Sequence, residues 1–233
     1  MCGYVRRHIG PKTLNEFMEL LGITGYYDDN NDEPELKHFY PAFGGNPDRA
    51  IEGLIIEEDG ELKLVDATWW YDCTEEDGEF KVGTRTTFNA RNLDGRYWKS
   101  AIRHRRAIVV ATGLGEGKTI DGKNKHFLVT SDRLLLLGAV YQRFPSGRYS
   151  CAIITRDAHP RFEAYHEKAF PLFLPYNVEF LKLWLSQADE QQPQIAHLLA
   201  SPKIFANLSI LPVKTFKGGV ATGEMEYLAA DGE

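Results

Sequence analysis

The chain has 233 residues, of which 43% are hydrophobic and 26% are charged, and its formal net charge is -6. This composition excludes an intrinsically disordered protein, and the negative charge argues against a general nucleic-acid binder. No apolar run is long enough to cross a membrane and no signal peptide is evident, so we expect a cytoplasmic protein. The length suits one domain, which we predict over residues 1–233.

The three cysteines, Cys2, Cys73 and Cys151, are odd in number and far apart. This pattern argues against a disulfide framework, and no two of them have the spacing of zinc ligands. We therefore expect neither a metal nor a cofactor. Cys151 lies in an apolar run, which predicts a buried thiol.

The first predicted element is a helix over residues 14–21, where apolar residues share one face. Thr13 and Glu16 have the spacing of a capping box at its start, and Gly22 is a suitable stop.

The middle of the chain contains short apolar or β-branched runs separated by turn residues, which predict strands. These runs are 53–58, 61–67, 106–112, 126–130, 134–140 and 149–155. The dipeptide Asp59-Gly60 predicts a hairpin, and Asp77-Gly78, Asp121-Gly122 and Ser146-Gly147 predict further turns.

Two helices are predicted near the carboxyl end, over 177–186 and 193–201, and the last twenty residues are expected to be partly frayed. Strands and helices do not alternate regularly, which excludes a doubly wound parallel sheet. We predict an α+β fold with a mostly antiparallel, partly barrel-like β-sheet surrounded by helices.

Cys2 follows the initiator methionine directly. If Met1 is removed, by an aminopeptidase or by the protein itself, Cys2 carries an α-amine beside its thiol. The reference pKa values of these groups, about 8 and about 8.5, leave both partly nucleophilic at neutral pH. The amine can form an imine with an aldehyde, and the thiol can then close a thiazolidine ring. Gly3 allows the backbone to turn tightly beside this residue.

A basic segment, residues 96–106, carries five lysines or arginines and no acid. Such a patch can bind phosphate even on an acidic protein, although a solvated basic surface is the simpler interpretation.

Three further segments follow the MCG start: TTFNARN at 86–92, RRAIVVATGLGEGK at 105–118 and SCAIITRDAHPRFEAYHEKAFPLFL at 150–174. In this order they resemble the motifs MCGR, NARxE, RRCLxPxxGFYEW, FxIITxxA and HxRMP of the SOS-response-associated peptidase (SRAP) family. HFYPAF at 38–43 resembles the family's YNxAP segment more weakly, and TWWYD at 68–72 takes the place of its WGL segment.

The resemblance implies that Cys2 crosslinks to abasic sites in single-stranded DNA and that the protein removes its own Met1. By the same correspondence, Asn89 would hold the amino-terminal residue, Glu116 would act as a catalytic acid or base, and His166 would move protons at the sugar. Read without the resemblance, Glu116 could instead belong to a flexible polar loop, and Asn89 to a turn.

The resemblance also implies phosphate contacts by Arg91, Arg105 and Arg106. Trp69 and Trp70 could stack on the bases of a splayed strand, although at least one of two adjacent residues in a strand should face the core.

The sequence departs from the family motifs at several positions. Tyr4 replaces the arginine of MCGR, Leu93 replaces the glutamate of NARxE, and GLGEG lacks the aromatic residues of GFYEW. His166 lies one residue further from Pro171 than the motif has it, and Lys168 replaces its arginine.

We therefore predict an enzyme that binds single-stranded DNA with abasic sites and crosslinks to them during the DNA damage response. We expect it to act as a monomer, without membrane or metal. One alternative is an amidohydrolase like the class II glutamine amidotransferases, which also begin with MCG but continue with an HRGPD-like segment that is missing here. Another is a single-stranded DNA binder without catalysis. No Cys-His pair supports a general cysteine peptidase.

Overall fold

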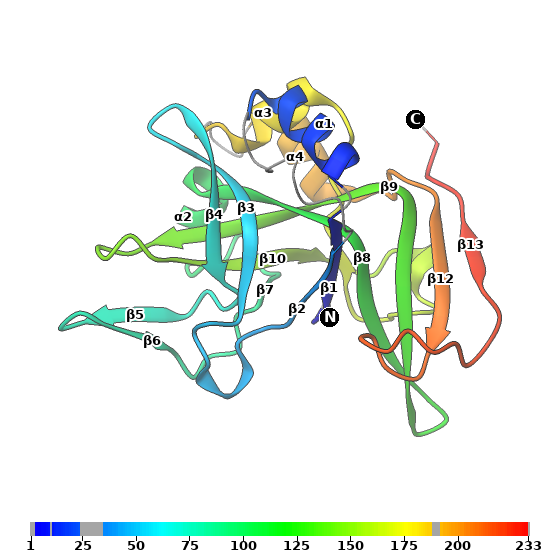
Figure 1. Ribbon diagram of the computed structural model, residues 1–233. Helices are drawn as coiled ribbons and strands as arrows, with labels where there is room; N and C mark the ends of the chain where they lie inside the picture. The colour runs from blue at the N-terminus through cyan, green and yellow to red at the C-terminus, as the bar shows by residue number, and fades with distance from the viewer. Residues whose placement is uncertain (1–2, 10, 24–34, 188–191, 233) are drawn as a thin grey trace.

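The computed structural model describes residues 3–9, 11–23, 35–187 and 192–232 (Figure 1). The strands are β1 (Val5–Ile9), β2 (Glu35–Phe39), β3 (Ala50–Glu58), β4 (Glu61–Thr68), β5 (Cys73–Glu76), β6 (Glu79–Val82), β7 (Asn89–Ala90), β8 (Arg106–Ile120), β9 (Lys123–Arg143), β10 (Tyr149–Arg156), β11 (Phe170–Pro171), β12 (Leu208–Val213) and β13 (Glu226–Leu228). The helices are α1 (Pro11–Leu21), α2 (Lys99–His104), α3 (Val178–Leu185) and α4 (Pro193–Ala200), and the 3-10 turns are η1 (Phe43–Gly45) and η2 (Pro160–Phe162).

The main sheet has the order β13-β12-β9-β10-β4-β3-β8-β1-β2, and β8 also pairs with β9. The strands β9, β10, β4, β3 and β8 therefore close into a ring. Most pairings are antiparallel, but β10 runs parallel to β4 and to β7. Helices α1, α3 and α4 gather at one end of the ring, and the β5–β6 hairpin projects away from it (Figure 1). The predicted α+β fold with a partly barrel-like sheet is confirmed.

Three of the predicted turns connect hairpins through Asp-Gly dipeptides. Asp59-Gly60, Asp77-Gly78 and Asp121-Gly122 all have φ between 50° and 79°. Positive φ at both central residues is the geometry of a type I′ turn, whose twist matches that of the flanking strands. These turns fix the β3–β4, β5–β6 and β8–β9 hairpins.

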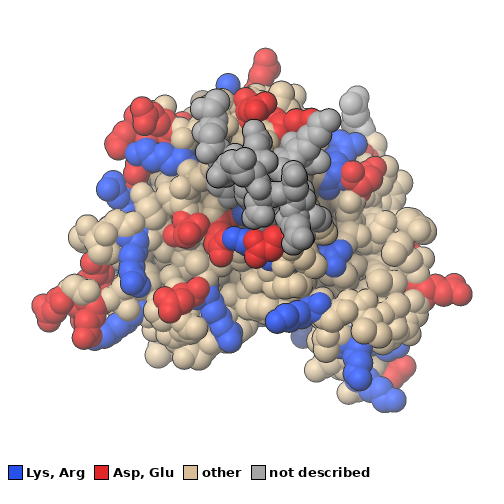
Figure 2. Space-filling model, in the orientation of Figure 1, with Lys and Arg blue, Asp and Glu red and all other residues tan. Residues whose placement is uncertain are grey.

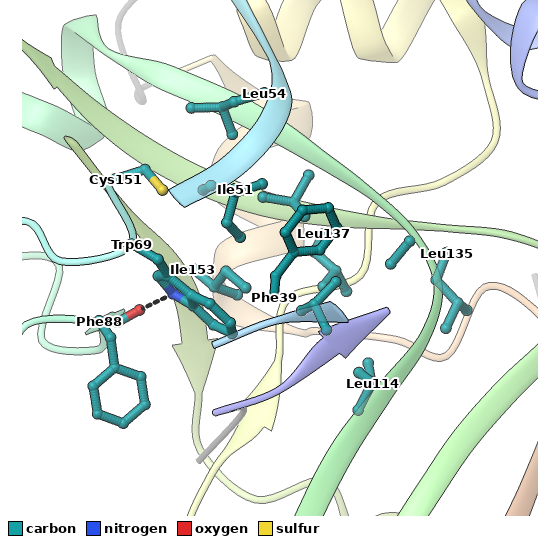
Figure 3. Packing of buried hydrophobic residues seen from close by; sticks show 14 of the residues in the cluster. Phe39, Ile51, Leu54, Trp69, Phe88, Leu114, Leu135, Leu137, Cys151 and Ile153 are labelled. Atoms are coloured by element: carbon teal, nitrogen blue, oxygen red, sulfur yellow. Dashed lines mark hydrogen bonds between the residues drawn. The ribbon is translucent and has the colours of Figure 1, made fainter. Parts of the chain in front are cut away.

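The largest hydrophobic cluster fills the ring (Figure 3). Trp69 is fully buried there, and its indole Nε1 donates a hydrogen bond of 2.9 Å to the Phe88 carbonyl. Cys151 is also fully buried, as predicted. A second cluster packs the apolar faces of α1 and α3 against the outside of the ring.

Helix α1 begins at Pro11, three residues earlier than predicted. Thr13 therefore lies within the helix, and the predicted capping box is wrong, because proline suits the first helical position without a capping side chain there. The predicted stop is confirmed. Gly22 has φ of 87°, its N–H bonds to the Glu19 carbonyl, and the N–H of Ile23 bonds to the Met18 carbonyl, which is a Schellman motif.

Strands β8 and β9 are longer than predicted. The runs 126–130 and 134–140 are parts of one strand, and β8 continues through residues 113–120, a stretch that also fits a flexible loop in the sequence. Pairing between these stretches satisfies their backbone groups, a long-range effect that local composition does not reveal. A register shift between Ala111 and Gly113 divides β8 into two halves.

The carboxyl-terminal segment, expected to be partly frayed, pairs β13 with β12. Beyond this strand, Asp231 accepts hydrogen bonds from the Ile204 backbone N–H (2.7 Å) and from Arg161 Nη1 (2.6 Å). Among the residues described, no helix combines the length and the apolar character needed to cross a membrane.

Candidate active site

Glu116 lies in the second half of β8, between Gly115 and Gly117, and is 1% exposed. Burial disfavours the charged carboxylate and raises the pKa of Glu116 to about 7. A carboxyl group with this pKa can give or take a proton near neutral pH, which suits a catalytic acid or base.

His166 lies beside Glu116 and follows η2, where its backbone N–H bonds to the Phe162 carbonyl. Its Nδ1 is 2.8 Å from the Gly117 carbonyl oxygen and 3.5 Å from Glu116 Oε2. Because a carbonyl oxygen only accepts, this bond assigns a hydrogen to Nδ1, and Nε2 of the neutral ring keeps its lone pair. Burial lowers the pKa of His166, which favours the neutral form.

Lys118, which was not predicted, supports this pair. It lies on the same face of β8 as Glu116, because side chains alternate along a strand. Its Nζ donates a hydrogen bond of 2.6 Å to the Glu163 carbonyl and lies 3.9 Å from Glu167 Oε2. The ammonium therefore ties β8 to the segment that carries His166. A strand prediction through residue 118 would have placed it beside Glu116.

The amino-terminal strand leads to the same place. Val5 pairs with Leu114, and the Gly115 N–H donates a hydrogen bond of 2.9 Å to the Tyr4 carbonyl. Gly3 is thereby held next to Gly115. Cys2, the predicted nucleophile, lies outside the described residues.

A cleft of about 400 Å³ opens where β1 ends, with Gly3, Gly115 and Gly117 among its lining residues. Within the described strands, residues 116–120 of β8 pair with β9 alone, so the cleft runs along a free edge of β8. Its apolar lining consists of Phe43, Phe88 and Phe216. Its polar lining consists of Lys118, Thr119, Asn124, Lys125 and His126.

The SRAP family profile, described as SOS response associated peptidase, matches residues 1–217. The chain belongs to the SRAP family. No functionally curated protein matches its sequence.

Solved structures agree on the fold of this SRAP protein. A phage-related protein from Bordetella bronchiseptica is similar with a TM-score of 0.63 at 20% identity, over 92% of this chain and 95% of that chain. A protein from Bacteroides thetaiotaomicron has a TM-score of 0.57 at 18% identity, covering 91% and 92% of the two chains. A second Bordetella bronchiseptica protein has a TM-score of 0.62 at 16% identity, covering 92% and 100%.

Asn89 begins β7, next to the cleft residue Phe88, and the side chain is half-buried. Its Nδ2 donates a hydrogen bond of 3.5 Å to the Ile153 carbonyl on β10. Asn89 thus adjoins a cleft residue along the chain but does not line the cleft, whereas Glu116 and His166 approach each other at 3.5 Å.

Arg106 begins β8, ten residues from Glu116, which corresponds to about 30 Å along a straight strand, and Arg105 directly precedes it. Arg106 is 1% exposed and donates hydrogen bonds to the backbone carbonyls of Trp184, Ile102, Arg103 and Ser186. Arg105 is half-buried, and its Nε bonds to the Tyr141 carbonyl. Neither guanidinium faces the cleft in this SRAP structure, and Arg106 belongs to the protein's interior.

Of the remaining predicted DNA contacts, one is exposed and two are buried. Arg91 is half exposed and pairs with Asp157 at 3.1 Å, so it is accessible to a phosphate. Trp69 and Trp70 are 0% and 5% exposed, and Trp70 Nε1 bonds to the Gly83 carbonyl. Both indoles belong to the hydrophobic core and pack on Phe88, in the segment that follows β4. On the face drawn in Figure 2, acidic and basic side chains are interspersed.

Proposed function

We propose that this SRAP protein binds single-stranded DNA and joins Cys2 to the aldehyde of an abasic site through a thiazolidine ring. The observation that carries the proposal is the buried Glu116–His166 pair beside Gly3, the residue that follows Cys2. SRAP membership points to the DNA damage response, and the pair supplies proton donors and acceptors next to the amino terminus.

The proposed reaction begins after hydrolysis of the Met1–Cys2 peptide bond, which consumes one water. The abasic sugar opens to an aldehyde when a proton leaves its anomeric hydroxyl and another reaches the ring oxygen. The Nε2 lone pair of neutral His166 suits the first transfer. The Cys2 amine then adds to the carbonyl carbon to give a carbinolamine.

Loss of water from the carbinolamine gives the imine and requires an acid at the departing hydroxyl. Protonated Glu116, with a pKa of about 7, suits this role and becomes a carboxylate. The Cys2 thiol then adds across the C=N bond, with sulfur joining carbon and a proton reaching nitrogen. The five-membered ring closes, and formation of the crosslink from the open aldehyde releases one water.

The test is incubation with a single-stranded oligonucleotide that carries one abasic site, followed by a denaturing gel. We expect a shifted band with the wild type and none with Cys2→Ala or with an oligonucleotide whose aldehyde has been reduced. The matched control is Thr74→Val, an exposed position in β5 that does not line the cleft, and this variant should crosslink normally. Equal shifted bands from wild type and Cys2→Ala would refute the assigned nucleophile.

Two measurements separate this function from the alternatives. Intact mass should show that Met1 is absent from the wild type. Ammonia release from glutamine, without crosslinking, would indicate an amidotransferase-like amidohydrolase. Salt-sensitive DNA binding without a covalent product would indicate a non-catalytic binder.

A further inference from the structure

The cleft lies beside the Glu116–His166 pair, and neither of these two residues is among its lining residues. Its volume of about 400 Å³ lies in the range of about 300–1,000 Å³ that is typical of small-molecule sites. A sugar that has lost its base is smaller than the ligands that such sites hold. Because side chains alternate along a strand, Gly115 and Gly117 face the side of β8 opposite to Glu116. The part of the cleft that Gly117, His126 and Phe216 border lies on that face.

Phe216 closes one end of this part of the cleft. It lies in a turn after β12 where the Gly219 N–H bonds to the Thr215 carbonyl (3.1 Å). The ring packs so tightly on Gly115 that a Cβ there would lie 2.7 Å from it. The ring also stacks with Tyr4, with 5.1 Å between the centroids. GLGEG lacks the aromatic residues of the family motif at Leu114, Gly115 and Gly117, and Phe216 fills the space next to Gly115.

The space next to Gly117 is different. Among the residues that the structure describes, a Cβ at Gly117 would meet only the Lys125 carbonyl, at an ordinary 3.6 Å. The missing side chain leaves the backbone of β8 open to close approach by a planar group. The ring of His126, which pairs with Gly117 and is perpendicular to Phe216 at 4.9 Å, borders the same space.

The borders of this space match the chemistry of a nucleotide. Phe216 and His126 offer apolar and aromatic surface on which a base can stack, and such stacking does not depend on the identity of the base. Lys118 and Lys125 supply cations to a neighbouring phosphate. Since Gly3 lies in the same cleft, a strand that reacts at the amino terminus can place its next base here.

We infer that the space over Gly117 binds the nucleobase of the nucleotide adjacent to the abasic site. This inference rests on the proposed function and adds a base-specific contact to it. The strand passes around the free edge of β8, with the reacting sugar near Glu116 and the neighbouring base between Phe216 and His126. Crosslinking is therefore faster when that neighbour carries a base.

The test compares oligonucleotides in which the abasic site is flanked, on the 5′ or the 3′ side, either by adenine or by a tetrahydrofuran spacer without a base. On one side, we expect the wild type to crosslink roughly tenfold faster with adenine. Gly117→Val should bring the ratio of the two rates to about one, because its side chain occupies the base site, and the ratio cancels any effect on catalysis that is common to both strands. A valine is compatible with folding, since Gly117 lies in a strand without positive φ and has room for a Cβ. Thr74→Val is again the matched control.

A second measurement does not depend on crosslinking. Fluorescence anisotropy with unreactive strands, in which a tetrahydrofuran replaces the abasic site, should show the same base-dependent affinity and its loss in Gly117→Val. Equal rates and affinities with adenine and spacer on both sides, or a preference that persists in Gly117→Val, would overturn the inference. Base-dependent binding without any crosslink would instead contradict the proposed function.

Discussion

Each end of β8 buries one ionisable side chain, Arg106 at one end and Glu116 at the other, and the two side chains have different surroundings. At the Arg106 end, β8 pairs with β3 and β9 inside the ring, and four backbone carbonyls accept hydrogen bonds from the guanidinium. At the Glu116 end, β8 pairs with β9 alone among the described strands, and burial raises the pKa of the carboxyl group to about 7 beside His166. A buried charge that is satisfied by the backbone stabilises the fold, whereas one whose pKa is moved toward neutrality at a cleft is available for proton transfer.

The largest expected effect is on activity at the Glu116 end. Glu116→Gln keeps the size of the side chain but cannot donate or accept the proton, so crosslinking should slow by about 10²–10⁴-fold. The rate is measured on denaturing gels under single-turnover conditions. A rate within threefold of wild type would show that Glu116 has a structural role, as Arg106 does, and no catalytic one.

At the other end of β8, substitution of Arg106 should lower the stability of the protein. Arg106→Met leaves several buried carbonyls without their donor, and we expect the free energy of unfolding to fall by about 3–5 kcal/mol. Urea denaturation measures this change. The crosslinking rate per folded molecule should be unchanged, and a selective loss of activity in folded Arg106→Met would contradict the contrast between the two ends.

Glu116 should also make stability depend on pH. Its pKa is about 7 in the folded protein against an ordinary value of 4.5, so the unfolded chain loses this proton first and stability falls as pH rises from 4.5 to 7. The total is about 3 kcal/mol at about 1.4 kcal/mol per pH unit. Relative to wild type, Glu116→Gln should therefore gain about 3 kcal/mol between about pH 4 and about pH 8. His166 is common to both proteins and cancels to first order. If the free energy of unfolding depended on pH in the same way in both proteins, the pKa of Glu116 would be near its ordinary value.

The smallest effect is on the shape of the rate profile. Neutral His166 is required as the base, and its pKa is lowered from 6.5, while protonated Glu116 is required as the acid. The Cys2 amine must also be unprotonated, and its reference pKa is about 8. Crosslinking should therefore rise to about pH 7, stay level to about pH 8 and fall roughly tenfold per pH unit above that. A rate that rises steadily through pH 8 would show that Glu116 acts as a carboxylate instead.

The sequence predicts the local features of this molecule well. The type I′ turns at Asp59-Gly60 and Asp121-Gly122 are set by the residues in the turn, and the Schellman motif at Gly22 by the residues around it. The strand at the Glu116 end of β8 is harder to predict from the sequence. Its glycines and polar residues are typical of a loop, and they form a strand only because they pair with β9.

The site shows the same division between local and distant causes. The motifs identified Glu116 and His166, which meet at 3.5 Å although fifty residues separate them. They did not identify Phe216, which packs on Gly115 from a turn a hundred residues away. They also misplaced Arg106, since a cationic residue at the start of an apolar strand does not reveal the carbonyls that surround it in the fold.

The most direct test of the central claim is to locate the crosslink in the protein. After nuclease and protease digestion of the covalent complex, mass spectrometry should find the sugar remnant on the peptide that begins with Cys2, with the loss of one water and with both the amine and the thiol blocked. A remnant on a lysine such as Lys118, or on Cys2 sulfur with a free amine, would contradict the account.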